Sequence, residues 1–214
     1  MIQMRWDELT FGQASFSFSV VNIFVSFVGA ISVVLFPSIK RLDSQTLAPL
    51  YSKIRDVISP LMFTAMICYF PMAKILAWWL PQYSDSIQYL GVLLPMMIFT
   101  SKVGILTDNY LKAYRRERIM LWINLACMTI GVGLFVLSAY GFNSLDFVIY
   151  SVVFVVMLRS VVSEFFVTRT IGKIPYVDFL IELVMSLLFI VVARYTSLLY
   201  GFLIYFALVA VYVF

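Results

Sequence analysis

Residues 110–141 read YLKAYRRERIMLWINLACMTIGVGLFVLSAYG, a group of four cationic side chains followed by an uncharged run from 119 to 141. A helix needs about 20 apolar residues to cross the hydrocarbon core of a membrane, so the run is long enough to span a bilayer. In a soluble protein the basic group would predict contact with nucleic acid. Beside such a run it is typical of a cytoplasmic anchor between two membrane helices. The stretch therefore favours an integral membrane protein that does not bind nucleic acid.

The composition of the whole chain agrees with this interpretation. Of its 214 residues, 63% are hydrophobic and 12% are charged, whereas soluble domains are about half apolar and about a quarter charged. A soluble fold of this size cannot bury so much apolar surface. We therefore expect an all-α, polytopic membrane helical bundle that forms a single transmembrane domain over residues 1–214.

Long apolar runs divide the chain into seven candidate membrane spans. None alternates in the way that an outer-membrane barrel requires, so all are expected to be helices. The last two are separated only by residues 195–197 and should form a hairpin. Pro60, Pro71 and Pro95 lie inside the second and third spans, where proline interrupts the hydrogen bonds of a helix. The spans cover residues 13–36, 57–80, 86–107, 119–141, 145–168, 177–195 and 197–214.

Basic residues lie in alternate connections between these spans. Lysine and arginine occur near 37–56, 108–118 and 169–176, and are absent from the connections near 82–85 and 141–146. Because basic loops stay in the cytoplasm, the pattern predicts an N-terminus outside and a C-terminus in the cytoplasm. The first of these connections is the longest. It fits either a short amphipathic helix along the lipid headgroups or a polar linker.

Residues that serve catalysis or cofactor binding are scarce. The chain has no histidine, which removes histidine-dependent acid–base catalysis and the common zinc sites. Its two cysteines, Cys68 and Cys127, lie in apolar runs and are interpreted as packing residues. No phosphate-binding glycine loop or nucleophile elbow occurs. We therefore expect no enzymatic activity, no cofactor and no metal.

The first span carries a narrow stripe of small and polar residues. They recur at intervals of three or four, so they share one face of a helix. Such a stripe fits either close packing against another helix or the wall of a hydrated cavity. Asn22, near the middle of the bilayer, favours the cavity because an amide there needs hydrogen-bond partners. The stripe consists of Ser15, Ser19, Asn22, Ser26 and Gly29.

Several ionisable residues lie within or near the ends of the spans, where a charge costs about 3 kcal/mol or more. Arg159 is the deepest cation, and with Lys102 and Asn22 it is a candidate for contact with an anionic cargo. Lys102 is also close enough to the cytoplasmic end to snorkel. Glu164 and Glu182 are candidate coupling carboxylates, although Glu182 also fits an interfacial position. The set comprises Lys74, Lys102, Arg159, Glu164, Glu182 and Arg194.

Three stretches carry further patterns. ISVVLFPSIKRL (31–42) ends a span with Phe-Pro and a basic pair. WWLPQYSDSIQYLGVLLP (78–95) has a Leu-Pro-x-Tyr turn before a helix, and TDNYLKAYRRERIMLWIN (107–124) joins an Asn-Tyr-Leu-x-Ala stretch to the basic group. In this order they resemble the lipid-linked oligosaccharide flippases of bacterial polysaccharide and O-antigen export, within the multidrug/oligosaccharidyl-lipid/polysaccharide exporter superfamily. Residues 145–214 match only in hydropathy.

The resemblance implies two pseudo-symmetric lobes around a central cavity, of which this chain would be the C-terminal lobe. The missing N-terminal lobe, or a second copy of this chain, would complete the cavity. The implied activity is flipping of a polyprenyl diphosphate sugar across the bacterial cytoplasmic membrane by alternating access, with Arg159, Lys102 and Asn22 meeting the cargo. Membrane lipids and the machinery that polymerises polysaccharide would be further partners. The alternatives are a drug or cation antiporter of the same superfamily, a membrane enzyme or scaffold of polysaccharide assembly, and an inactive fragment.

Overall fold

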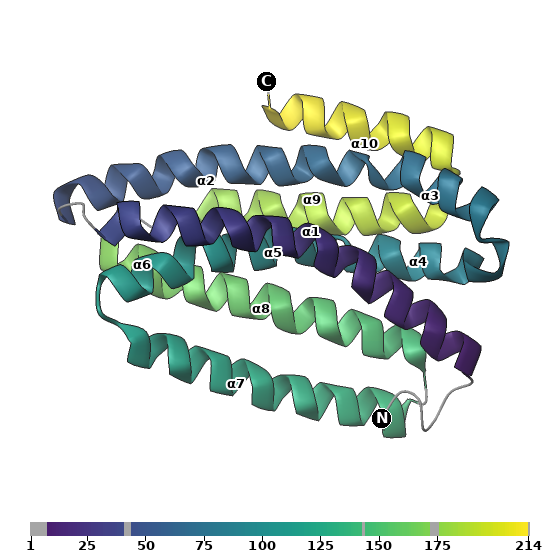
Figure 1. Ribbon diagram of the computed structural model, residues 1–214, viewed down its shortest axis with the longest axis horizontal. Helices are drawn as coiled ribbons and strands as arrows, with labels where there is room; N and C mark the ends of the chain where they lie inside the picture. The colour runs from purple at the N-terminus through teal and green to yellow at the C-terminus, as the bar shows by residue number, and fades with distance from the viewer. Residues whose placement is uncertain (1–7, 41–43, 143, 172–175, 214) are drawn as a thin grey trace.

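The computed structural model describes residues 8–40, 44–142, 144–171 and 176–213, shown in Figure 1. Within these ranges the chain is built of helices and contains no strand. Lipid offers no hydrogen bonds to a backbone, so an apolar chain in a membrane satisfies its N–H and C=O groups inside helices. The predicted all-α bundle is confirmed for the described residues.

The helices run back and forth along one long axis (Figure 1). They are α1 (Glu8–Lys40), α2 (Ser44–Ile67), α3 (Tyr69–Trp79), α4 (Ser84–Leu93), α5 (Pro95–Lys102), α6 (Asp108–Ala113), α7 (Glu117–Val136), α8 (Leu145–Ile171), α9 (Tyr176–Tyr195) and α10 (Leu198–Val213). Short turns join some of them: the 3-10 turn η2 (Pro81–Tyr83) and the π-helical turns η3 (Val103–Thr107) and η4 (Leu137–Gly141).

Five stretches of the described chain are long and apolar enough to cross a membrane, and they match the first five predicted spans. The sixth predicted span lies in α9, and the seventh lies in α10, a shorter apolar helix of 16 residues. α9 and α10 pack against each other after a two-residue connection, so the predicted hairpin is present. The five stretches are Leu9–Val34, Pro49–Trp79, Asp85–Ala113, Glu117–Gly141 and Leu145–Ile171.

Two of these spans contain a helix break at a proline. α2 ends at Ile67, the residue whose carbonyl would accept the N–H that Pro71 lacks. α5 begins at Pro95, and Leu94 alone separates it from the end of α4 at Leu93. Both breaks follow from the missing hydrogen bond of proline. Pro60, in contrast, lies inside α2 without ending it.

The connection expected at 37–56 is neither a separate amphipathic helix nor a linker. α1 extends to Lys40 and α2 begins at Ser44, while residues 41–43 lie outside the described part of the chain. Leu47, Tyr51 and Arg55 recur at intervals of four along α2 and are buried against the bundle. Because this face packs from the start of the helix, α2 carries its polar residues into the interior.

The connections expected near 108–118 and 169–176 are also shorter than predicted. The first is mostly helix: α6 ends at Ala113 and α7 begins at Glu117. In the second, α8 runs to Ile171 and α9 begins at Tyr176, and residues 172–175 lie outside the described chain. The predicted boundaries therefore place the helix ends too early.

The span Asp85–Ala113 forms the centre of the bundle. Of its most apolar stretch, 83% is buried, against 12% for the span in α1 and 11% for the span in α7. α1, α2, α8 and α9 pack around this central span, and α7 lies at the edge against α8 (Figure 1). A helix surrounded in this way carries a charge only where its neighbours provide the opposite one. Lys102, at the end of α5, meets that condition.

Candidate functional site

Buried charged residues from four helices meet near one end of the bundle. Arg55 comes from α2, Lys102 from α5, Glu164 from α8 and Glu182 from α9, and the structure buries all four. Asp178, one turn before Glu182, joins them with a side chain that is 51% exposed. We call these five residues the charge cluster. Ionised groups persist at such depth only when they neutralise one another.

Lys102 connects the two buried carboxylates of the charge cluster. Its ammonium group forms ion pairs with Glu164 and with Glu182. The expectation that Lys102 snorkels to the interface is therefore wrong, because both carboxylates hold the ammonium group inside the bundle. Glu182 is likewise buried inside the bundle. Lys102 directly precedes the π-helical turn η3, a feature common at functional sites.

Arg55 contacts all three carboxylates of the charge cluster. Its Nε lies 3.0 Å from Oε1 of Glu164, and its Nη1 donates a hydrogen bond to Asp178. Its Nη2 lies 3.6 Å from Oε1 of Glu182, which also accepts a 2.8 Å hydrogen bond from the hydroxyl of Ser59. Each carboxylate of the charge cluster thus faces a cation, and α2, α5, α8 and α9 are joined through these contacts.

Phe179 lies beside both cations of the charge cluster. Its ring centroid is 5.4 Å from Nζ of Lys102 and 5.6 Å from Cζ of Arg55. The negative face of an aromatic ring stabilises a cation, most strongly where water is excluded. Even so, two cations face three carboxylates, so the cluster carries one net negative charge when all five groups are ionised.

Two hydroxyl groups close to the charge cluster are buried without a hydrogen-bond partner among the residues that the structure describes. One belongs to Tyr51, which lies beside Glu164 but makes no hydrogen bond of ordinary geometry. The other belongs to Ser186, one turn after Glu182 on α9. Buried polar groups are normally paired with protein or with ordered water. The region is therefore polar enough to hold water next to the ion pairs.

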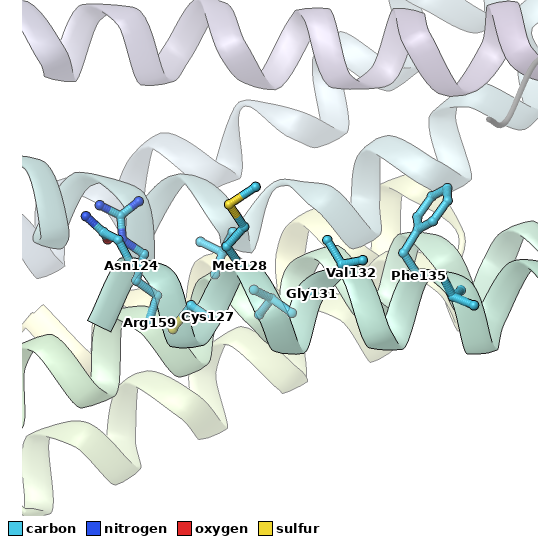
Figure 2. Close-up of a pocket in the computed structure, with 10 residues that line it drawn as sticks. Asn124, Cys127, Met128, Gly131, Val132, Phe135 and Arg159 are labelled. Carbon is cyan, nitrogen blue, oxygen red and sulfur yellow. The ribbon is translucent and has the colours of Figure 1, made fainter. Parts of the chain in front are cut away.

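A groove between α7 and α8 is the second candidate site. It has a volume of about 630 Å³, and most of its walls are apolar. Its strongly polar residues are Asn124 of α7 and Arg159 of α8, which Figure 2 shows together at one end of the groove. The lining residues are Asn124, Cys127, Met128, Gly131, Val132, Phe135, Val136, Val155, Val156 and Arg159.

Arg159 is bound less tightly than the cations of the charge cluster. Its side chain is 36% exposed, and Nη2 lies 3.5 Å from Oδ2 of Asp108. This is its only ion pair in the ranges that the structure describes, and its Nε is buried without a hydrogen-bond partner. A guanidinium has five N–H donors in a fork that matches phosphate and carboxylate. Arg159 therefore keeps donors for a ligand in the groove.

The structure does not bring the three predicted cargo residues into one site. Lys102 lies in the charge cluster, Arg159 lies in the groove, and Asn22 is exposed on α1. The predicted stripe on α1 is turned away from the bundle. The face of α1 that packs is the one with Gln13 and Ser17, which donate hydrogen bonds to the backbone of Gln82 and Ser86.

Sequence reasoning missed Arg55, because it assigned this residue to a connection. A signal was available in the spacing of Leu47, Tyr51, Arg55 and Ser59, which recur at intervals of four. All four are buried on one face of α2. Extending the helical period past the proline at 49 would have placed Arg55 inside the bundle.

Comparisons with protein-family models, with curated proteins and with solved structures find no match for this chain. The resemblance to the oligosaccharide flippases stays a prediction.

Proposed function

We propose that this chain is one lobe of a transporter that flips a lipid-linked oligosaccharide across the bacterial cytoplasmic membrane. The observation that carries the proposal is the groove between α7 and α8, with apolar walls and Arg159 beside Asn124 at one end (Figure 2). A polyprenyl chain requires apolar contacts, and its diphosphate requires charge-assisted hydrogen bonds. The groove offers both to a single amphipathic anion.

In this proposal the chain crosses the membrane seven times, with α9 and α10 as the sixth and seventh spans. Basic residues gather at the end of the bundle where α6 ends and α7 begins, and we assign that end to the cytoplasm. The N-terminus then lies outside and the C-terminus in the cytoplasm. Arg159 falls in the cytoplasmic half of α8, on the side from which an exported cargo enters.

The exposed faces of α1 and α7 support a lobe that works with a partner. Asn22 is exposed on α1, and an amide in contact with lipid tails is costly. We propose that this face meets the missing lobe, or a second copy of the chain, and lines the central cavity with it. Rocking of the two lobes would expose that cavity to each side of the membrane in turn.

The experiment is to replace Arg159 with alanine in cells whose surface polysaccharide depends on this chain. We expect export to fall about tenfold or more, since a charge-assisted hydrogen bond contributes roughly 1.5–3 kcal/mol. Immunoblots of the membrane fraction check that the variant is inserted normally.

Arg194 is the matched control for Arg159. Within the described part of the chain it also forms one ion pair, at 3.5 Å from Asp146, and its side chain is 29% exposed, but it lies at the opposite end of the bundle. Arg194→Ala should leave export nearly unchanged, and Arg159→Lys should retain part of it. Equal export by the two alanine variants would overturn the role of Arg159.

A second candidate function is exchange of a drug or cation for protons. The observation that favours it is the burial of two carboxylates, Glu164 and Glu182, which remain candidate coupling residues. In vesicles that contain no polysaccharide precursor, an antiporter would transport a cationic dye in exchange for protons when a pH gradient is applied. A flippase would leave the concentration of the dye inside these vesicles unchanged.

A further inference from the structure

We propose that an apolar pocket between α3 and α10 binds one anionic phospholipid, with an acyl chain in the pocket and the phosphate on Lys74. The pocket has a volume of about 450 Å³ and lies where the two helices pack against each other (Figure 1). We call it the α3–α10 pocket. It is independent of the proposed transport function, because it lies at the periphery of the bundle and needs no cargo.

Aromatic side chains form the floor of the α3–α10 pocket. Phe70 of α3 is buried, and its ring centroid lies 6.4 Å from that of Phe202 of α10. Phe70 also packs against Phe189 of α9, with 6.0 Å between the ring centroids. Beside this floor the two helices come very close, since a Cβ added at Gly201 would lie 2.6 Å from a ring carbon of Phe70. Contacts from three helices therefore form the pocket before a ligand binds, as is usual for ligand sites.

The walls of the pocket fit a hydrocarbon chain. Pro71 of α3 and Leu198 and Leu199 of α10 complete its apolar lining. Among the lining side chains that the structure describes, two are polar, Lys74 and Ser197. Apolar walls favour a ligand whose own surface is apolar. Most of the ligand must therefore be hydrocarbon, with polar groups at one end.

Lys74 is available to bind the polar end of such a ligand. It is exposed, and within the described part of the chain it has neither an ion pair nor a hydrogen bond. Ser197, on the α10 side of the pocket, is also exposed and adds a hydroxyl group. Ammonium and hydroxyl groups both donate hydrogen bonds to phosphate oxygens. The single positive charge favours a headgroup with net negative charge over a zwitterionic one.

Exposed aromatic residues place Lys74 near the level of the lipid headgroups. Trp78 and Trp79 are exposed at the end of α3. Tyr195 and Tyr200 are exposed on the two sides of the connection between α9 and α10. Tryptophan and tyrosine gather at the interface between membrane and water. Lys74 precedes the end of its span at Trp79 by little more than one helical turn, so its ammonium group can snorkel to the phosphates.

A phospholipid satisfies both parts of the α3–α10 pocket at once. A free phosphate would leave the apolar walls empty, and an uncharged lipid would leave Lys74 without a partner. The bilayer itself supplies phospholipid at high concentration, so a site of moderate affinity is filled by mass action. Because the bound lipid contacts α3 and α10 together, it holds the hairpin of α9 and α10 against the rest of the bundle.

The test is the dissociation constant of the first bound lipid, measured by native mass spectrometry on the delipidated chain in detergent. Phosphatidylglycerol should bind more tightly than phosphatidylcholine with the same acyl chains, which has no net charge. Lys74→Met should weaken the binding of phosphatidylglycerol about fivefold, the effect of one basic residue at a membrane surface, and leave phosphatidylcholine unchanged. Equal affinities for the two lipids in the original chain would overturn the proposal.

Two further variants make the result specific to Lys74. Arg194 is a cation at the same end of the bundle, but Asp146 lies 3.5 Å from it and neutralises it. Arg194→Met should therefore keep the affinity for phosphatidylglycerol, and so should Lys74→Arg, which keeps the charge. Equal losses in Lys74→Met and Arg194→Met would show a general effect of surface charge and exclude the site. Equal melting temperatures without lipid check that the variants are folded.

Crosslinking locates the acyl chain. Phosphatidylglycerol that carries a diazirine in one acyl chain should label Leu199 and Phe202, and the labelling should fall in Lys74→Met. Unlabelled phosphatidylglycerol should suppress it, whereas glycerol phosphate, which has no acyl chain, should not. Labelling spread equally over the exposed face of α7 would overturn the proposal. Stronger suppression by a polyprenyl phosphate than by phosphatidylglycerol would assign the pocket to a polyprenyl carrier and overturn it as well.

Discussion

Lys102 and Glu182 form an ion pair in the interior of the bundle although 80 residues separate them in the sequence. The same ammonium group also holds Glu164, so one lysine joins α5 to both α8 and α9. Each of these charges is stable at depth because the others are present. The position of each helix in this part of the bundle therefore depends on the rest.

Lys102→Met should destabilise the bundle strongly. It leaves Glu164 and Glu182 with Arg55 as their cation, and breaking a buried pair by removing one partner costs about 3–5 kcal/mol. Thermal unfolding in detergent micelles should show a lower midpoint than the original chain. Lys74→Met is the control, because Lys74 is exposed on α3. Adding Glu182→Gln to Lys102→Met should recover part of the loss, and equal midpoints for the two lysine variants would contradict the prediction.

Gly201→Ala should loosen the contact between α10 and its neighbours. A Cβ at this position would lie 2.6 Å from a ring carbon of Phe70 in α3 and 2.7 Å from Oγ1 of Thr196. To make room for it, α10 must move away from α3. Overpacking of this kind costs about 1–3 kcal/mol. Gly133→Ala in α7 serves as control, because no described atom beyond the adjoining residues and backbone of its own helix lies within 4 Å of the added Cβ. The prediction is wrong if both variants unfold at the same temperature.

Arg115→Gly should stabilise the turn between α6 and α7. Arg115 has φ of 54°, and hydrogen bonds from Arg115 to Lys112 and from Arg116 to Leu111 close the end of α6. This is the Schellman arrangement, in which glycine is favoured at the left-handed position by about 1 kcal/mol. Arg115→Ala removes the same charge and keeps the strain. The glycine variant should melt above the alanine variant, and the reverse order would exclude strain at this turn.

Single cysteines should report the orientation of the bundle. Gln82 and Arg116 are both exposed, and they lie in connections at opposite ends of the helices. In spheroplasts of a strain that carries the cysteine-free chain, an impermeant maleimide should label Gln82→Cys directly. Arg116→Cys should react only after the membrane is opened. Labelling in the opposite order would reverse the proposed topology.

Much of the helical architecture could be predicted because hydropathy is a local property. The run 119–141 reads as a membrane helix without knowledge of any neighbour, and the structure contains α7 there. The breaks at Pro71 and Pro95 follow equally from a missing N–H in the chain itself. Hydropathy does not predict the start of α2, where polar residues interrupt the apolar ones; the signal there is the four-residue spacing of Leu47, Tyr51 and Arg55, which are buried against the bundle.

The sequence alone determined the membrane class, the positions of the long apolar helices and the alternation of basic connections, because each depends on residues close together in the chain. Tertiary structure decided which charges meet. The rotation of each helix about its axis buries Arg55 beside Glu164, directs Lys102 to two carboxylates and leaves Asn22 on an outer face. That rotation is set by the packing of α2, α8 and α9 around the central span, and burial then makes the pairing of their charges obligatory.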